Sequence, residues 1–152
     1  MNSQNNIYDP VDVDQDYFLD HDEEREEFYT KALTLPGTIL EILFNEENTA
    51  RLKSLFESYQ LKPKQSEELS RLIRKILVAE IYLGDIVAEI TKRLEIDQEK
   101  AKGVANSLIG ELFTPALEDI KKLHVEKFGK KQETPPQPTN PNNVLDLRNN
   151  QK

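Results

Sequence analysis

An acidic stretch near the N-terminus, DVDQDYFLDHDE, carries carboxylates at the spacing of a calcium-binding loop. Positions 1, 3, 5, 9 and 12 of an EF-hand loop supply oxygen ligands, and here they are occupied by Asp12, Asp14, Asp16, Asp20 and Glu23. Position 6 must make a sharp turn, normally with glycine, but it is Tyr17. Only eleven residues precede the stretch, too few for the incoming helix. We therefore expect a disordered acidic segment over residues 1–21, without a metal site.

Three apolar residues interrupt the acids of this segment: Tyr17, Phe18 and Leu19. Such an island can dock in a groove of a partner while the acids steer toward a basic rim. It can equally cover the protein's own helices. The sequence leaves both interpretations open, and the three residues are candidate partner-binding residues.

Few other residues suit catalysis or metal binding. The chain has no cysteine and only two histidines, which excludes disulfides and leaves too few ligands for zinc. His21 lies in the acidic run as a surface residue, whereas His124 lies on the inner stripe of the last expected helix, where it would pack. No nucleophile turn or phosphate-binding glycine loop is present. We expect no enzyme and no cofactor.

The net charge of −8 belongs entirely to residues 1–33, which hold ten acidic and two basic residues. This segment favours basic partners and opposes nucleic acid or anionic lipid. The opposite charge gathers in KKLHVEKFGKK, with Lys121, Lys122, Lys127, Lys130 and Lys131. These lysines suit a helix C-terminus or could receive the acidic segment of the same or another copy. They also support an alternative function, a nucleic-acid-associated regulator that uses helices 97–113 and 115–131.

The C-terminal region, residues 131–152, combines a linker with a short apolar segment. QETPPQPTNPNN (132–143) is proline-rich and should be extended and disordered. Beyond it, Val144, Leu145 and Leu147 are further candidate partner-binding residues, because a tethered apolar stretch can add to a sheet edge or fill a groove. The alternative is that this segment folds back on its own domain or is a ragged end.

The elements between the two ends, residues 22–130, have helical periodicity. Helices are expected at 22–33 and 36–44, after a cap at Asn45, from Pro63 to about Gly84, at 86–94, after a cap at Asp97, and from Thr114-Pro115. Arg71, Arg74 and Lys75 fall on the polar face of the long helix. Apolar positions from Leu52 to Leu77 match those from Val87 to Leu112 at an offset of 35 residues, which indicates either a repeat or two hairpins with convergent packing.

The stretch LEIDQEKAKGVANSLIGEL resembles helices of small all-helical bacterial proteins, and the resemblance implies a fold but no activity. We expect an all-α protein, a small helical bundle of about five to seven helices built around two similar hairpins, with tails at 1–21 and 131–152. No segment reads as a signal peptide or a membrane span. The predicted function is a non-enzymatic cytoplasmic protein–protein interaction or adaptor module with a helical groove, which binds a protein partner or associates with itself.

Overall fold

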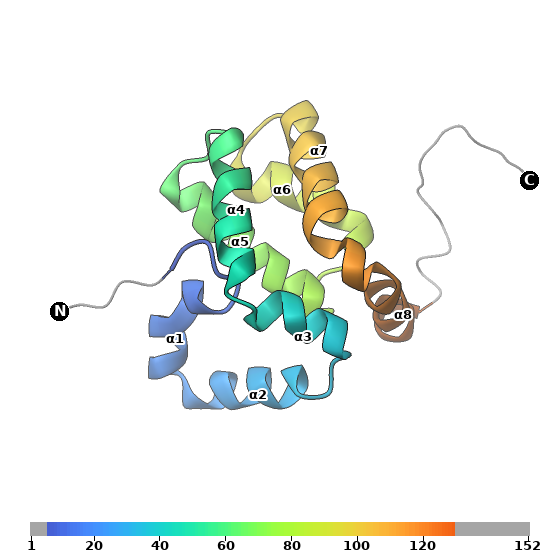
Figure 1. The fold of residues 1–152 in the computed structure, drawn as a ribbon. Helices are drawn as coiled ribbons and strands as arrows, with labels where there is room; N and C mark the ends of the chain where they lie inside the picture. The colour runs from blue at the N-terminus through green and yellow to red at the C-terminus, as the bar shows by residue number, and fades with distance from the viewer. Residues whose placement is uncertain (1–5, 130–152) are drawn as a thin grey trace, which may run out of the picture.

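The structure, a computed structural model, describes residues 6–129, and it confirms the all-α class because these residues contain helices and no strand (Figure 1). In chain order the elements are η1 (Asp12–Asp14), α1 (Gln15–Asp20), α2 (Asp22–Ala32), α3 (Gly37–Phe44), α4 (Glu47–Ser58), α5 (Pro63–Leu77), η2 (Leu83–Asp85), α6 (Ile86–Leu94), α7 (Gln98–Ser107), the π-helix η3 (Leu108–Phe113), η4 (Thr114–Ala116) and α8 (Leu117–Phe128).

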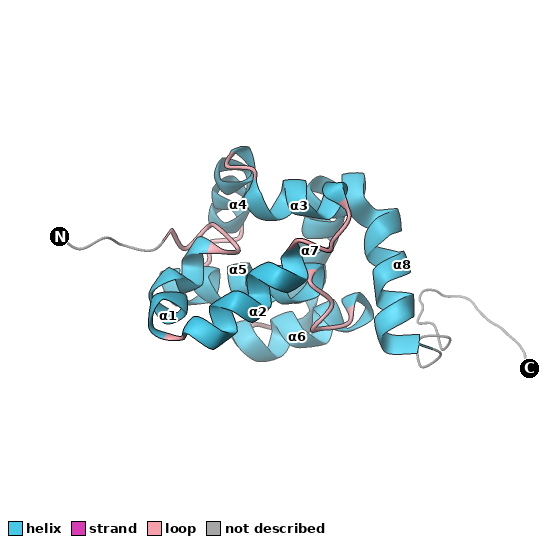
Figure 2. Ribbon diagram, turned by 90° about the horizontal axis from the view of Figure 1, so that it is seen from below, coloured by secondary structure: helices cyan, strands magenta, loops and turns pink. Residues whose placement is uncertain are grey.

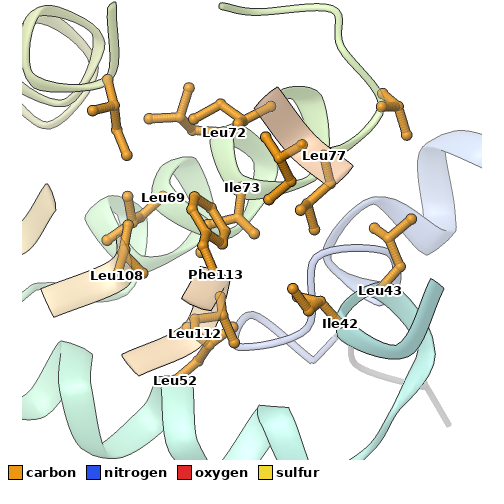
Figure 3. Close-up of a cluster of buried hydrophobic side chains, with 14 of the residues drawn as sticks. Ile42, Leu43, Leu52, Leu69, Leu72, Ile73, Leu77, Leu108, Leu112 and Phe113 are labelled. Carbon is orange, nitrogen blue, oxygen red and sulfur yellow. The ribbon is translucent and has the colours of Figure 1, made fainter. Parts of the chain in front are cut away.

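Helix α5 is the centre of the hydrophobic core. Its apolar side chains are fully buried: Leu69, Leu72, Ile73, Ile76 and Leu77. Figure 3 shows several of them facing residues of α3, α4 and η3. Burial of each such side chain is worth about 1.5–3 kcal/mol, so α5 supplies a large part of the folding free energy and fixes where the outer helices pack.

Local signals place the helix starts where the sequence predicts them. Pro63 is the first residue of α5, where a missing N–H costs nothing. The Asp97 carboxylate accepts a hydrogen bond of 2.7 Å from the Lys100 N–H and caps α7. Pro115 lies in the first turn of the segment that leads into α8.

The end of α5 differs from the prediction, since the helix stops at Leu77 and not near Gly84. Ala79 adopts a positive φ of 63°. The Glu80 N–H then bonds to the Lys75 carbonyl at 2.7 Å and the Ala79 N–H to the Ile76 carbonyl at 3.0 Å. This is a Schellman motif, which satisfies the last carbonyls of the helix. It was missed because the left-handed residue is alanine and not glycine.

The N-terminal segment also differs from the prediction of disorder through residue 21, because residues 12–20 form η1 and α1. Val11, Val13 and Phe18 are buried. The Asp9 carboxylate accepts hydrogen bonds from the N–H groups of Val11 and Asp12 at 2.8 and 2.9 Å, which starts the first turn. The prediction of disorder rested on the high content of acidic residues and gave too little weight to these apolar residues. The predicted tail at 131–152 lies outside the described residues.

Helices α1 and α2 lie along one side of α5 in Figure 2, and α8 lies at the far end of the molecule from α1. Helix α6 packs against both α5 and α7. The proposed 35-residue repeat stays a prediction. Within residues 6–129, no helix is both long enough and apolar enough to cross a membrane.

Candidate functional site

The N-terminal segment is fastened to α5 by one carboxylate that binds two arginines. The Asp14 carboxylate lies 2.7–3.0 Å from Nε and Nη2 of Arg71, a bidentate pair, and 2.8 Å from Nη1 of Arg74. Arg71 also bonds to Glu68 at 2.6 Å. Bidentate, charge-assisted bonds of this kind fix geometry as well as charge. We call Asp14, Arg71 and Arg74 the Asp14 clamp.

Aromatic rings cover the inner side of the Asp14 clamp. The guanidinium carbon of Arg74 lies 5.2 Å from the ring centroid of Phe18 and 5.9 Å from that of Phe28. The two rings stack at 5.4 Å, and Arg74 also donates to the Pro10 carbonyl at 3.2 Å. Arg74 is therefore buried, with a cation–π contact. The sequence prediction that it occupies the outer polar face is wrong, because α1 and α2 cover that face.

The electrostatics of the clamp keep it ionised. Burial by itself would raise the pKa of Asp14, but hydrogen bonds from Arg71 and Arg74, together with their charges, outweigh burial and hold this pKa below its usual range. The hydrogen bond between Asp14 and Arg71 raises the pKa of Arg71. Asp14 and Arg71 therefore stay charged at neutral pH.

A cavity of about 680 Å³ lies beside the clamp, between α1, α2 and α5. Its lining residues are Asp14, Tyr17, Phe18, Glu24, Glu27, Phe28, Lys31, Arg71, Arg74, Lys75 and Glu80. Its four basic side chains have carboxylate partners: the arginines bind Asp14, while Lys31 and Lys75 lie 4.0 and 3.7 Å from Glu80. Glu24 and Glu27 have no ion-pair partner within residues 6–129.

Helices α1 and α2 carry many exposed acids. The acidic face, as we define it, consists of Asp16, Asp20, Asp22, Glu23, Glu24, Glu26 and Glu27. Arg25 forms an ion pair of 3.1 Å with Asp22, and Lys31 is the other basic residue of α2. Such a concentration of like charge produces a strong negative potential over this side of the molecule.

The predicted apolar island is split by α1. Phe18 turns inward and is 8% exposed, whereas Tyr17 and Leu19 are 46% and 58% exposed. Tyr17 stacks on His21 at 3.9 Å, and Nδ1 of His21 lies 2.7 Å from the Tyr17 carbonyl. One island residue thus covers the protein's own helices, and two remain available at the surface. Val144, Leu145 and Leu147 lie outside the described residues.

The EF-hand carboxylates are dispersed. Asp12 accepts the Asn6 N–H at 2.6 Å, Asp14 binds the arginines, and Asp16 and Asp20 project from the exposed side of α1. Across residues 6–129, no three potential ligands are grouped to hold a metal ion.

Helix α8 presents the opposite charge. Lys121, Lys122 and Lys127 are exposed, and Val125 between them is 61% exposed. Glu118 and Glu126 are exposed on the same helix and reduce its positive potential.

His124 is buried in α8, as the sequence predicts, and both ring nitrogens are used. Nδ1 accepts the Leu83 N–H at 3.0 Å, and Nε2 donates to the Ile76 carbonyl at 2.8 Å. Burial lowers the pKa of His124, with a smaller opposing effect from the Ile76 carbonyl. The ring is therefore a neutral bridge from α8 to the end of α5.

Sequence reasoning missed the Asp14 clamp. The available signal was a pair of arginines three residues apart in α5, the long helix with apolar residues at most turns, because a helix buried on several sides leaves little solvent-facing surface for them. No family model matches the chain, and neither the curated proteins nor the solved structures compared with it give a match.

Proposed function

We propose that the protein is a non-enzymatic interaction module that binds a basic segment of a protein partner through the acidic face of α1 and α2. The observation that supports the proposal is the concentration of seven exposed acids on two adjoining helices that also expose Tyr17 and Leu19. A basic partner relieves the repulsion among these acids, and the attraction between opposite charges raises the association rate. The exposed apolar side chains provide surface area that a partner can bury.

The proposed module also includes a groove and a second docking segment. The two helical hairpins form the scaffold of the module, and the cavity beside the Asp14 clamp is its groove. Val144, Leu145 and Leu147 form a second docking segment, and the module acts in the cytoplasm. The protein could also associate with itself: the acidic face of one copy would then bind the lysines of α8 in another copy.

Fluorescence anisotropy tests this function with a labelled 18-residue amphipathic helix of lysine and leucine. The test variant carries four changes on α2: Glu23→Gln, Glu24→Gln, Glu26→Gln and Glu27→Gln. The matched control carries the same change at four exposed acids elsewhere: Glu46, Glu57, Glu99 and Glu111. If each lost pair is worth about 0.5 kcal/mol, the test variant binds roughly thirtyfold more weakly, and the control changes little. Equal weakening of both variants, or no binding to the wild type, would sink the proposal.

A second candidate is the nucleic-acid-associated regulator, which the exposed lysines Lys121, Lys122 and Lys127 favour. Phosphate contacts release counterions, so this binding weakens steeply with salt and with Lys→Gln changes at these three positions. A labelled 20-base-pair DNA duplex is the probe. Binding that is unaffected by the three changes would exclude α8 as a nucleic-acid surface.

A further inference from the structure

We propose that the C-terminal segment, residues 144–147, docks on an exposed apolar patch of its own chain that α2 and α3 form together. The proposal rests on the proposed function only in taking these residues as a docking segment, and it names the surface that receives them. The apolar patch, as we define it, consists of Tyr29 and Leu33 at the end of α2 and Leu40 and Phe44 of α3.

A contact between two aromatic rings joins the two halves of the apolar patch. The ring centroids of Tyr29 and Phe44 lie 6.3 Å apart, with an angle of 24° between the ring planes. Leu33 lies one turn after Tyr29, and Leu40 lies one turn before Phe44, on the same sides of their helices. The exposed fractions are 39% for Tyr29, 79% for Leu33 and 45% for Phe44. An apolar occupant would remove this area from water, which is favourable.

The other exposed large apolar side chains of residues 6–129 form no such group among themselves. Tyr17 and Leu19 are two residues apart on α1, so they point to different sides of that helix. Val125 lies on α8, at the far end of the molecule from α1 (Figure 2). The apolar patch therefore offers a short aliphatic segment more exposed apolar area than these positions do.

The C-terminal segment follows a helix that adjoins α3. Helix α3 packs against α8 (Figure 1), and the Thr38 hydroxyl donates to the Asp119 carboxylate at 2.6 Å. The path from Gly129 along α8 to this contact, and then along α3 to Phe44, is about 35 Å at about 1.5 Å per residue and about 10 Å between helix axes. Residues 130–143 are rich in proline and reach about 43 Å at about 3.1 Å per residue. The C-terminal segment can therefore reach the apolar patch of its own chain.

The charges around the apolar patch complement those of the segment. Glu26 and Glu41 are exposed and lie three residues before the two rings, on the same sides of their helices. Neither forms an ion pair within residues 6–129. The segment contains Asp146, but Arg148 and Lys152 follow it, so the end of the chain has a small positive charge. These exposed charges orient the segment and add little affinity.

Attachment to the same chain favours this occupant over a free partner. A segment on a short linker has an effective concentration of about 1 mM at its site. This concentration fills a site with an intrinsic Kd of about 0.1 mM to roughly 90%. A free partner of the same apolar chemistry would need a similar concentration in solution to compete. The C-terminal segment of the chain itself is therefore the inferred occupant.

A nitroxide label on the full chain tests the inference by nuclear magnetic resonance. The chain has no cysteine, so Asn149→Cys accepts a single label beside the segment. With an occupancy of roughly 90%, we expect the label to broaden the amide signals of Leu33 and Phe44 more strongly than those of α7. Equal broadening over both regions, or none at Leu33 and Phe44, overturns the inference.

Two variants of the labelled chain test the contribution of the aliphatic side chains. Val144→Ser with Leu147→Ser should abolish the selective broadening, because the segment loses most of the apolar area that it can bury. Asn140→Ser with Asn143→Ser is the matched control in the intervening residues and should retain it. Equal broadening of the apolar patch in the two variants would show that the label approaches it without docking.

Two variants test the receiving surface in the same way. Leu33→Ser removes the most exposed side chain of the apolar patch. We expect it to weaken docking about tenfold, which lowers the occupancy from roughly 90% to about 50% and reduces the broadening at Phe44. Leu19→Ser makes the same change at an exposed leucine of α1 and should have no effect. Unchanged broadening in Leu33→Ser would overturn the assignment of the apolar patch.

A mixed sample establishes which copy supplies the segment. Isotope-enriched protein without a label is mixed with an equal amount of labelled protein that is not enriched. We expect no broadening of the apolar patch in this sample, whereas broadening would assign the segment to a second copy and overturn the inference. None of these samples contains a basic peptide, so failure here leaves the proposed binding of a basic partner intact.

Discussion

Two polar side chains, those of Asp14 and His124, attach outer elements to α5, and they do so in opposite electrostatic states. Asp14 is a charged group that joins the N-terminal segment to the partly exposed Arg71 and the buried Arg74. His124 is a neutral group that joins α8 to backbone atoms of Leu83 and Ile76. Both complete their hydrogen bonds, so neither leaves a buried polar atom without a partner.

The difference follows from what each group faces. Asp14 retains some solvent contact and meets two guanidinium groups, which favour the ionised carboxylate. His124 is 2% exposed and meets a backbone donor, a backbone acceptor and the rings of Tyr82 and Phe128. A charge on His124 would have no counterion, and burial therefore lowers its pKa. The N-terminal attachment thus depends on charge pairing, and the C-terminal attachment depends on a group that stays uncharged.

The largest effect is expected from His124→Ala. The change leaves the Leu83 N–H and the Ile76 carbonyl without partners and opens a cavity in a closely packed region. We expect a loss of about 3–5 kcal/mol in the free energy of unfolding, measured in urea. Lys121→Ala, an exposed change on the same helix, should stay within about 0.5 kcal/mol. A loss below about 1 kcal/mol for His124→Ala would mean that α8 is held by other contacts.

Asp14→Ala is expected to cost less, about 2–3 kcal/mol in the same measurement, because Arg74 loses its ion-pair partner whereas Arg71 keeps its bond to Glu68. Arg74 suffers most, since it is 8% exposed. Asp16→Ala, two residues further along and exposed, is the matched control and should change stability by about 0.5 kcal/mol or less. If the two variants were equally stable, the Asp14 clamp would not hold the N-terminal segment.

Acid should weaken the His124 attachment before it affects Asp14. A histidine whose folded pKa lies below its unfolded value of about 6.5 adds stability above pH 6.5 and loses it as pH falls toward the folded value. Asp14, whose pKa is also lowered, loses its contribution only below about pH 4. From pH 7.5 to 5.5 we expect a fall in the free energy of unfolding, measured in urea, that depends on His124.

Two variants isolate the histidine responsible for this pH dependence. His21→Gln should keep the full loss, and His124→Gln should reduce it strongly, because glutamine does not titrate. The same loss in both variants would assign the effect to the acidic face and not to His124.

The sequence predicts part of the His124 attachment but not the Asp14 attachment. Periodicity around Ile120 and Phe128 predicted that His124 is buried, and helix signals located α2, α3, α6 and the start of α5. The Asp14 clamp was not predictable, because it joins residues 57 and 60 positions apart along the chain, and nothing local pairs Asp14 with α5. The acidic composition instead predicted disorder, which Val11, Val13 and Phe18 overcome by burial.

The smallest effect tests the scaffold between the two attachments. Gln60 is exposed, with φ of 58°, in a Schellman motif at the end of α4. Gln60→Gly should raise the free energy of unfolding by about 0.5–1 kcal/mol because glycine adopts a positive φ without strain. Ser58→Gly, inside α4, should lower it by about as much. Destabilisation by Gln60→Gly would contradict the left-handed turn.

Amide hydrogen exchange decides whether the acidic face of α1 and α2 is the surface that binds the basic partner. Exchange of the wild type is measured with and without the 18-residue lysine–leucine helix. We expect the peptide to slow exchange in residues 15–33 and to leave exchange in α8 unchanged. Protection confined to α8, or none in residues 15–33 at saturating peptide, would contradict it.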